Sequence, residues 1–402
     1  MDARDRVIVA GAGPVGLLVA LALANRDIPV LVLEAEPDLA QDLRAGSFHP
    51  PSLEMMAPYG ITDEMQAIGI KVPRWQIRDR VEGLIAEWDL GLLADETPYP
   101  YRLHLEQHRL TPMIYRRLTT LAHVEVRFNA RVVDCGQNAD GVWVLAETPD
   151  VAERFAGAWL IGADGARSAV RKLLDIDFEG FTWPERFVVV STAYDFSRYG
   201  YTPNAYVADP DQWTAVFRMP DSGPPGLWRI AFPVPVDESD DETLAPDAVE
   251  RRMQYFHPRP ERYEVRYKSV YKVHQRVASE FRRGRVLLAG DAAHLNNPLG
   301  AFGLNGGIHD AINLADKLGK VWRGEADDAV LDRYVRQRRT VNIEYIQESS
   351  IRNLDLLAER DPAIKQARFH EIRRANRDPQ LAKEFLLRSS MIGSIRREAA
   401  IA

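Results

Sequence analysis

The stretch from Leu287 to Gly307, LLAGDAAHLNNPLGAFGLNGG, concentrates residue types that bind ligands. Asp291 follows an apolar run, so its carboxylate is expected at the carboxyl end of a buried strand, where ligands usually bind in open α/β sheets. There it could accept hydrogen bonds from a polyol. The glycines at 300, 303, 306 and 307 then leave a backbone with few side chains. We expect a helix to begin near Leu304.

A second ligand-binding pattern lies near the N-terminus, where Gly11, Gly13 and Gly16 form G-x-G-x-x-G between an apolar strand and a helix. Gly11 permits the tight turn, Gly13 lets a pyrophosphate approach the backbone, and Gly16 lets the helix pack closely on the strand. Glu34 ends the next apolar strand, where an acid accepts hydrogen bonds from a ribose and repels a 2′-phosphate. The pattern predicts a bound dinucleotide, either NAD or FAD.

A third pattern, GADGARSAVR, covers residues 162–171 after another apolar strand. Asp164 stands where the strand gives way to a helix. The motif by itself also fits a plain helix start, with Asp164 near the helix N-terminus and with Arg167 and Arg171 in solvent.

The elements that must position these residues follow from hydrophobic periodicity. Residues 6–34 read as strand, glycine turn, helix and strand, which is a βαβ unit. Residues 110–121 read as an amphipathic helix, and residues 124–147 as alternating strands. Four further strands are expected between residues 187 and 235, and nearly everything after residue 326 reads as helix. The chain is therefore expected to be an α/β protein with a separate strand-rich block.

Composition limits the classes of function. The chain has 402 residues, 46% hydrophobic and 27% charged, with a net charge of −7, which is typical of a multi-domain soluble protein. No basic excess indicates nucleic-acid binding, and no apolar run is long enough for a membrane span. The first residues lead directly into a strand, so we expect no signal peptide and a cytoplasmic location. Cys135 is the only cysteine, so redox chemistry would need a bound cofactor.

The three patterns, in this order, resemble the signatures of FAD-dependent aromatic hydroxylases, the single-component flavoprotein monooxygenases typified by para-hydroxybenzoate hydroxylase. The resemblance spans residues 5 to about 325. It implies a Rossmann-like FAD-binding domain of that type, with an interleaved, mainly antiparallel β-sheet substrate domain and a helical C-terminus. The corresponding ranges are 1–178 with 276–325 for FAD, 179–275 for the substrate and 326–402 for the helical segment.

The resemblance also implies contacts with FAD, which would lie extended between the N-terminal turn and the glycine-rich loop. The implied FAD-binding residues are Gly11, Gly13, Pro14, Val15, Gly16, Glu34, Ala35, Arg44, Gln107, Asp164, Asp291, Pro298, Gly303, Leu304 and Asn305. The helix start at Leu304 and Asn305 would stabilise negative charge on the reduced flavin, an effect of about 0.3 to 1 kcal/mol, or ~2 kcal/mol when buried. No metal is expected.

The function implied is that NAD(P)H docks transiently and reduces FAD. Oxygen then forms a C4a-hydroperoxyflavin, which hydroxylates a small aromatic or heteroaromatic ring. The catalytic candidates are His49 as acid or base, Arg218 as reader of a substrate carboxylate, and Pro298 as a wall beside the flavin. His294 is more simply a structural histidine. Relatives often have a polar residue where this chain has Phe302, so we expect a more apolar pocket.

Three other classes use similar motifs. Flavin-dependent halogenases generally carry W-x-W-x-I-P, whereas residues 228–233 here read WRIAFP. A reductase or dehydrogenase of the same superfamily would carry the same flavin motifs and stays open. A non-catalytic escort protein is disfavoured because Asp291 and the glycine loop are retained. The C-terminal helices are expected to pack on the body of the protein or on a second subunit of a homodimer.

Overall fold

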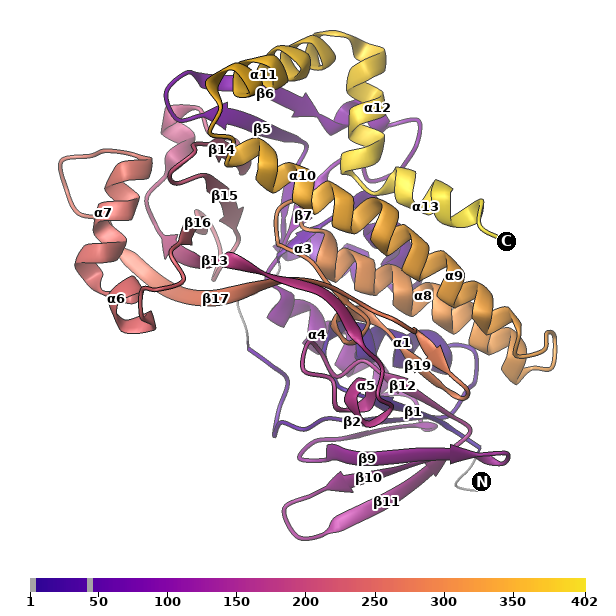
Figure 1. Ribbon diagram of the computed structural model, residues 1–402. Coiled ribbons are helices and arrows are strands. Elements are labelled where there is room, and N and C mark those ends of the chain that lie inside the picture. The colour runs from indigo at the N-terminus through magenta and orange to yellow at the C-terminus, as the bar shows by residue number, and fades with distance from the viewer. Residues whose placement is uncertain (1–4, 42–45) are drawn as a thin grey trace.

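The computed structural model describes residues 5–41 and 46–402. A six-stranded sheet in the order β18-β19-β12-β1-β2-β8 forms its lower half (Figure 1). Neighbouring strands from β19 to β8 run parallel, and only β18 is antiparallel to its neighbour. The strands are β1 (Val7–Ala10), β2 (Val30–Leu33), β8 (Val124–Arg127), β12 (Trp159–Gly162), β18 (Arg282–Arg283) and β19 (Val286–Leu288). Their continuous apolar runs are buried, as expected for a parallel sheet covered on both faces.

Helices and a small sheet cover the parallel sheet. Helix α1 (Pro14–Ala24) packs between α4 (Gln107–Leu118) and α8 (Phe302–Trp322). An antiparallel sheet of β9 (Arg131–Asn138), β10 (Gly141–Glu147) and β11 (Ala152–Gly157) contacts β1 and β12. The expected βαβ unit, the amphipathic helix and the strand pair around Asp140-Gly141 are therefore confirmed.

The strand-rich block is an eight-stranded sheet in the order β20-β17-β13-β16-β15-β14-β5-β6. The strands are β5 (Arg74–Asp79), β6 (Gly83–Asp89), β13 (Phe178–Thr192), β14 (Asn204–Ala208), β15 (Thr214–Met219), β16 (Leu227–Val234), β17 (Val265–Ala278) and β20 (His294–Leu295). The pair β5–β6 joins this sheet although it lies within the range that the sequence assigned to the FAD-binding domain.

Two long strands connect the halves of the molecule. β13 and β17 pair antiparallel from Phe178 and Ala278 to Thr192 and Val265, and they extend from the parallel sheet into the upper sheet (Figure 1). β20, which belongs to the stretch first singled out in the sequence, pairs with the end of β17. The glycine-rich loop is thus attached to both sheets.

The two faces of the eight-stranded sheet are covered by different helices. One face packs on α6 (Asp240–Leu244) and α7 (Pro246–Phe256), with Val188, Trp228 and Ile230 in this core. The other face packs on α10 (Glu348–Leu357), α11 (Pro362–Arg377) and α12 (Pro379–Ser389). This second face also carries Tyr206 and Phe217.

The C-terminal segment is helical, as expected. It comprises α9 (Val330–Val341), a π-helical turn η5 (Asn342–Gln347), α10 to α12, and α13 (Ile392–Ala399). α9 packs on α8, and α13 packs on α9 and on α2 (Pro50–Met56). These helices therefore cover the body of their own chain. Across the described parts of the chain, every helix is too short or too polar to cross a membrane.

Candidate active site

Four parallel strands deliver the three sequence motifs to one edge of the sheet. Side by side, β19, β12, β1 and β2 end just before Asp291, Asp164, Gly11 and Glu34, respectively. The carboxyl edge of an open parallel sheet is where such folds bind ligands. Motifs separated by more than 250 residues in the chain therefore converge on one place.

The glycine turn after β1 is shaped by close packing at two positions and by open space at a third. Gly11 has φ of +102°, and a Cβ there would lie 2.5 Å from the Ala163 carbonyl oxygen. A Cβ on Gly16 would collide with the Gly11 carbonyl oxygen. A Cβ on Gly13, by contrast, would meet no atom within 4 Å. Helix α1, which begins at Pro14, has no side-chain cap, so its first amides can serve a ligand.

Glu34 and Ala35 follow β2 beside this turn, and both are half-buried. The Glu34 carboxylate accepts hydrogen bonds from the amide of Ala12 at 2.6 Å and from the amide of Glu36 at 3.0 Å. These bonds fix its orientation and leave further lone pairs on both oxygens. Gln107 is half-buried at the first position of α4. Arg44 lies outside the described residues.

Asp164 does what the plain structural interpretation of its motif predicts. Its carboxylate accepts hydrogen bonds from the Ser168 hydroxyl and from the amides of Ala169 and Val170 at the start of α5 (Ala169–Leu173). The expectation that Arg171 is solvated is wrong. Its guanidinium is buried over the Phe178 ring and donates to the Ala292 carbonyl, next to Asp291, at 2.8 Å. Arg171 thus joins the second motif to the third.

Packing also joins the first motif to the third. Val15 of α1 touches the places where a Cβ on Gly290 or Gly307 would stand, at 2.9 Å and 2.5 Å. Asp310 of α8 accepts hydrogen bonds from the Gly290 amide at 2.9 Å and from His294 Nε2 at 2.7 Å. His294 is therefore structural, as expected.

The glycine-rich loop ends in α8, which begins at Phe302, two residues before the expected start. Gly300 has φ of +105°, and the residue before the helix, Ala301, has no side-chain cap bond. Pro298 is exposed, while Gly303 and Leu304 are half-buried. Asn305 is fully buried, and its side chain bonds the backbone of Ser47, His49 and Ala301. Asn305 can therefore serve a cofactor only through its backbone.

Phe302 does not line the site in the way its sequence position suggested. Its ring packs with Ile346 and Met391 of the C-terminal segment, and it stacks on His49 with 5.8 Å between ring centres. Phe302 therefore packs the glycine-rich loop against the C-terminal helices.

The residues present at this edge fit FAD. Space stays open above Gly13, where a pyrophosphate would approach, although neighbouring glycines are tightly packed. The first turns of both α1 and α8 lack side-chain caps, and the Asp291 side chain is exposed between them. These features suit a ligand with phosphates, a polyol and a flat ring.

A cluster of buried polar side chains lies between the glycine-rich loop and the eight-stranded sheet. We call it the buried polar cluster; it consists of Ser47, His49, Arg102, His104, Asn204 and Tyr206. His49 Nε2 lies 2.8 Å from the Gly300 carbonyl oxygen, and the Gly300 amide donates to the Tyr206 hydroxyl at 3.1 Å. Arg102 donates to Asn204 Oδ1 at 2.6 Å and lies over the Trp75 ring at 4.7 Å. The cluster thus directly adjoins the loop.

Several polar atoms of this cluster have no hydrogen-bond partner within the described residues. They are Ser47 Oγ, His49 Nδ1, Arg102 Nε, His104 Nε2 and Asn204 Nδ2. Buried polar atoms are seldom left without a hydrogen bond. Five such atoms in one cluster therefore indicate a site that a polar ligand completes.

The cluster is electropositive. Arg102 is 2% exposed, and no carboxylate among the described residues pairs with it. Burial lowers the pKa of Arg102 and of nearby Arg229. A buried cation without a counter-charge is costly, so this site favours an anionic ligand.

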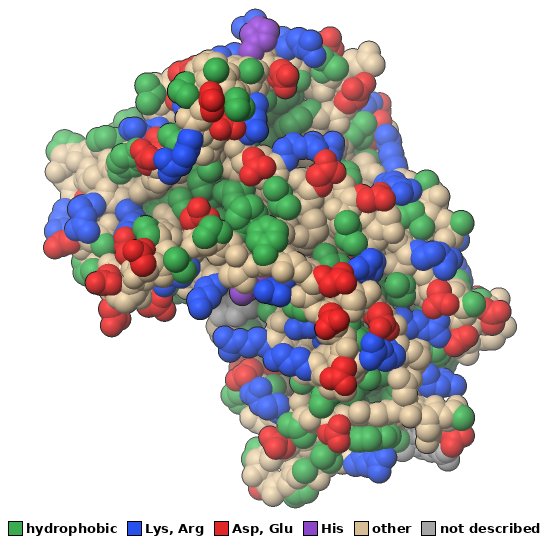
Figure 2. Space-filling view, viewed as in Figure 1, with side chains coloured by type: hydrophobic (Ala, Val, Ile, Leu, Met, Phe, Trp, Pro, Cys, Tyr) green, Lys and Arg blue, Asp and Glu red, His purple; other side chains and the backbone are tan. Residues whose placement is uncertain are grey.

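The face of the sheet beside the cluster is mainly apolar, with several small side chains. Tyr206 and Phe217 share it with the small side chains of Ala215 and Ala231, and Arg229 alternates onto it between Trp228 and Ile230. In Figure 2, apolar side chains gather in a hollow over β13 and β15 beside α10.

The expectation that Arg218 reads a substrate needs correction. Arg218 alternates with Phe217 along β15, so its side chain points to the opposite face. There its guanidinium donates to the Pro225 carbonyl oxygen at 2.8 and 2.9 Å. Only its own backbone carbonyl reaches the cluster, 2.9 Å from His104 Nδ1.

Of the cluster, His49 is the residue named above as a catalytic candidate from the sequence. The signal for Arg102 and His104 was present: in residues 102–106, RLHLE, polar and apolar residues alternate, as in a strand with one polar face. They lie on β7 (Arg102–His104), which pairs with β3 (Ser47–Phe48) and β4 (Ile70–Val72). Asn204 has no comparable local signal.

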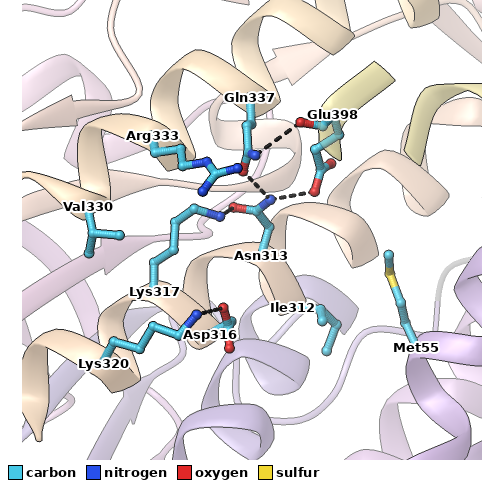
Figure 3. A pocket seen from close by; sticks show the side chains of 10 residues that line it. All are labelled: Met55, Ile312, Asn313, Asp316, Lys317, Lys320, Val330, Arg333, Gln337 and Glu398. Atoms are coloured by element: carbon cyan, nitrogen blue, oxygen red, sulfur yellow. Dashed lines mark hydrogen bonds and ion pairs between the residues drawn. The ribbon is translucent and has the colours of Figure 1, made fainter. Parts of the chain in front are cut away.

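A cavity of about 310 Å³ lies between α2, α8, α9 and α13 (Figure 3). Its polar side chains bond one another: Lys317 donates to Asn313 at 2.5 Å, and Asn313 donates to Gln337 and Glu398. Burial lowers the pKa of Lys317 to about 8. The cavity shares no residue with the buried polar cluster.

Comparisons with known proteins agree with this geometry. A family model described as an FAD binding domain matches residues 4–349. The chain is 37% identical over 394 residues to para-nitrophenol 4-monooxygenase of Pseudomonas sp. (strain WBC-3), covering 96% of each sequence. It is 37% identical over 371 residues to 6-hydroxy-3-succinoylpyridine 3-monooxygenase of Pseudomonas putida (strain DSM 28022 / S16), covering 90% of this chain and 91% of that protein.

Solved structures show the same fold. The crystal structure of p-nitrophenol 4-monooxygenase from Pseudomonas putida DLL-E4 superposes with a TM-score of 0.91, at 36% identity and with 98% of each chain covered. A flavin-dependent monooxygenase solved with FAD and substrate superposes with a TM-score of 0.79 at 24% identity. That match covers all of this chain and 72% of the other.

Proposed function

This chain belongs to the family of FAD-dependent aromatic hydroxylases, and we propose that its substrate is an aromatic ring whose hydroxyl stands opposite an electron-withdrawing substituent. The chain is an FAD-dependent, NAD(P)H-consuming monooxygenase of small aromatic rings. The proposal concerns which ring it oxidises and where.

The printed names of the two near-full-length relatives share one chemical pattern. Para-nitrophenol and 6-hydroxy-3-succinoylpyridine each carry a hydroxyl opposite a nitro or acyl group, and each name places the oxygenation at the carbon that bears that group. We infer that this chain acts on a substituted phenol or hydroxypyridine, with 4-nitrophenol as the first candidate.

The observation that carries the proposal is the buried Arg102, which has no carboxylate beside it among residues 5–41 and 46–402. A hydroxyl opposite a nitro or acyl group is acidic, and its anion spreads charge to oxygens at both ends of the ring. Arg102 Nε and Asn204 Nδ2, both buried donors without partners in the described part of the chain, would bond such oxygens. A charge-assisted hydrogen bond of this kind is about twice as strong as a neutral one.

Bound FAD supplies the redox chemistry, taking a hydride from NAD(P)H and activating oxygen. The chain holds it with the residues proposed from the sequence. These are Gly11, Gly13, Pro14, Val15, Gly16, Glu34, Ala35, Gln107, Asp164, Asp291, Pro298, Gly303, Leu304 and Asn305, the last through its backbone. His49 would orient the glycine-rich loop through its bond to the Gly300 carbonyl. The sheet face and α10 to α12 would exclude water from the reacting ring.

Two broader assignments accompany this proposal. The substrate domain would consist of residues 179–275 together with 74–89, because β5 and β6 belong to its sheet. The enzyme would work in the cytoplasm, because its reductant NAD(P)H is regenerated inside cells.

The test is turnover of 4-nitrophenol by the FAD-loaded protein, followed by NAD(P)H oxidation, oxygen uptake and nitrite release. Oxygenation at the carbon bearing the nitro group would release nitrite, whereas oxygenation beside the hydroxyl would leave the nitro group in place. Nitrobenzene, which lacks the hydroxyl, and 4-methylphenol, which lacks the withdrawing group, are the controls. If neither 4-nitrophenol nor a hydroxypyridine ketone stimulates NAD(P)H oxidation, this substrate class is wrong.

A further inference from the structure

The hydrogen bonds of the buried polar cluster fix which ring nitrogens of its histidines carry protons. His104 Nδ1 lies 2.9 Å from the Arg218 carbonyl oxygen. A carbonyl can only accept, so Nδ1 donates, and Nε2 of the neutral ring holds a lone pair. His49 is arranged the other way, because its Nε2 donates to the Gly300 carbonyl and its Nδ1 holds the lone pair. Within the described residues, neither lone pair has a partner.

Both rings are neutral near pH 7. Burial is the main reason, and it lowers the pKa of His104 to about 4, with Arg102 and Arg229 adding repulsion. Burial, with help from Arg102, likewise lowers the pKa of His49 well below its usual value. Glu106, two residues after the end of β7, pairs with Arg109 at 3.3 Å and accepts a hydrogen bond from the Asp221 amide, and its charge also attracts Arg229. Each lone pair is therefore available to a hydrogen-bond donor on a ligand.

The surroundings distinguish the two histidines. His104 lies two residues from Arg102, so both side chains leave the same face of β7. Its ring meets the edge of Phe217 with 5.9 Å between ring centres, and Phe217 is half-buried on the sheet face that α10 to α12 cover. His49 instead stacks on Phe302, which packs into the C-terminal helices. A hydroxyl bound at His104 would therefore have a guanidinium beside it, ready to stabilise an anion.

We propose that His104 is the catalytic base that takes the proton of the substrate hydroxyl, an inference that rests on the proposed function. In this step the phenol O–H bond breaks, an N–H bond forms at His104 Nε2, and the electron pair stays on the phenolate oxygen. Arg102 stabilises that oxygen, and the ring gains electron density at the carbon opposite. The imidazolium formed beside the phenolate is paired, so the burial that lowers its pKa in the empty site is offset. His104 Nε2 then releases this proton to solvent when the product leaves, which restores the neutral ring.

Two substitutions separate this role from a structural one. His104→Asn places an amide nitrogen near the position of Nδ1, so it keeps the bond to the Arg218 carbonyl and loses the acceptor at Nε2. His104→Gln places an amide oxygen near Nε2, which accepts a hydrogen bond without acting as a base. His49→Gln is the comparison at the other buried histidine, because its amide nitrogen can still donate to the Gly300 carbonyl while the acceptor at Nδ1 is lost. FAD content and near-ultraviolet circular dichroism report whether each variant is folded and loaded.

The measurement is the pH dependence of turnover with phenols of different acidity, together with the absorption of bound 4-nitrophenol, whose colour reports its ionisation. We expect both His104 variants to lose kcat by about 100-fold or more for weakly acidic phenols. Their rates should recover as pH rises and the phenol ionises in solution, and bound 4-nitrophenol should ionise at a higher pH than in the wild type. KM should change much less.

Two results would overturn the inference. A folded, FAD-loaded His104→Asn protein with the wild-type pH profile and the wild-type colour of bound 4-nitrophenol would exclude His104 as the base. The same would follow if His49→Gln alone produced the altered profile. If the wild type turns over no phenol, the proposed function and this inference both fail. If the wild type is active and His104→Asn matches it, only the inference fails.

Discussion

Gly13 and Gly16 lie three residues apart at the start of helix α1, but the space around their Cα atoms differs. A Cβ on Gly13 meets open space, whereas a Cβ on Gly16 collides with the Gly11 carbonyl oxygen. We predict that Gly13→Ala leaves the apoprotein as stable as the wild type and weakens FAD by at least about tenfold, or ~1.4 kcal/mol, by blocking the pyrophosphate. Fluorescence titration with FAD and thermal unfolding of the apoprotein measure the two effects.

Gly16→Ala is the matched variant, and it should lower the stability of the apoprotein by about 1 to 3 kcal/mol because the backbone must shift. Equal loss of apoprotein stability in both variants would show that Gly13 serves packing instead of a ligand. A Gly13→Ala protein with unchanged FAD affinity would place the pyrophosphate elsewhere.

Arg102 carries a second prediction at this scale. Arg102→Met removes the buried guanidinium that would pair with a phenolate, so the Kd of 4-nitrophenol should rise by about 100-fold, within the ~2 to 5 kcal/mol typical of such pairs. Arg218→Met, whose guanidinium reaches the opposite face of β15, should change Kd by less than about threefold. Titration of the FAD-loaded protein gives both values, and the reverse order would restore Arg218 as the reader of the substrate.

Candidate site residues were predictable from the sequence where a motif with fixed residue spacing forms a turn after a strand. Glycines at 11, 13 and 16, Glu34, Asp164 and Asp291 all follow apolar strands that the sequence predicts, and the structure places these strands side by side in one parallel sheet. The buried polar cluster does not follow such a rule. Arg102 and Asn204 are brought together by the pairing of distant strands, which periodicity alone cannot predict.

At the scale of elements, continuous apolar strands and long amphipathic helices were predictable because the pattern of apolar residues within each element shows which of its faces is buried. The pair β5–β6 was missed because RWQIRD and GLIAEWD mix charges with apolar residues. The pair joins the sheet through β5, whose partner β14 lies more than a hundred residues later in the chain. Membership of a sheet is decided by such distant pairing, so the boundary of the substrate domain could not be read locally.

Helices α8, α9 and α13 are joined by a buried ionic network that makes a further prediction. Arg338 of α9 donates to Asp310 of α8 at 2.6 Å and to Glu398 of α13 at 2.5 Å. Arg338→Met would leave Asp310 buried with much less compensation, which typically costs about 3 to 5 kcal/mol. Because Asp310 also holds the Gly290 turn, the variant should release FAD at lower urea concentrations than the wild type.

Urea unfolding followed by flavin fluorescence and circular dichroism tests this network. Arg336→Met, on the exposed side of the same helix, is the control and should change stability by less than about 0.5 kcal/mol. If Arg338→Met unfolds and retains FAD as Arg336→Met does, the C-terminal helices contribute nothing to the flavin site.

At the scale of the whole molecule, the active site is the place where two sheets and the C-terminal helices meet. β13 and β17 carry the chain from one sheet to the other, and β20 ties the glycine-rich loop to β17 (Figure 1). Phe302 then closes the loop against Ile346 and Met391. Any global loosening should therefore affect FAD binding and substrate binding together.

Lowering the pH should loosen the whole protein in this way, because several histidines are buried as neutral rings. Burial lowers the pKa of His104 to about 4 and that of His309 to about 3, from 6.5. Between pH 6.5 and about 4 the unfolded chain binds protons that the folded chain does not, so stability falls as pH falls. From pH 7.5 to 4.5, each of these two rings should cost at most roughly 2 to 3 kcal/mol.

Asp310 does not contribute to the change in stability between pH 7.5 and 4.5. Its pKa is lowered by His294 and Arg338 although burial opposes the shift, so the stability it contributes is lost only below about pH 4. We predict that His309→Gln, which removes one buried imidazole, makes the free energy of unfolding less dependent on pH between 7.5 and 4.5. Urea unfolding at several pH values measures this slope for both proteins. An unchanged slope in the variant would mean that His309 is protonated in the folded state, contrary to its burial beneath α2.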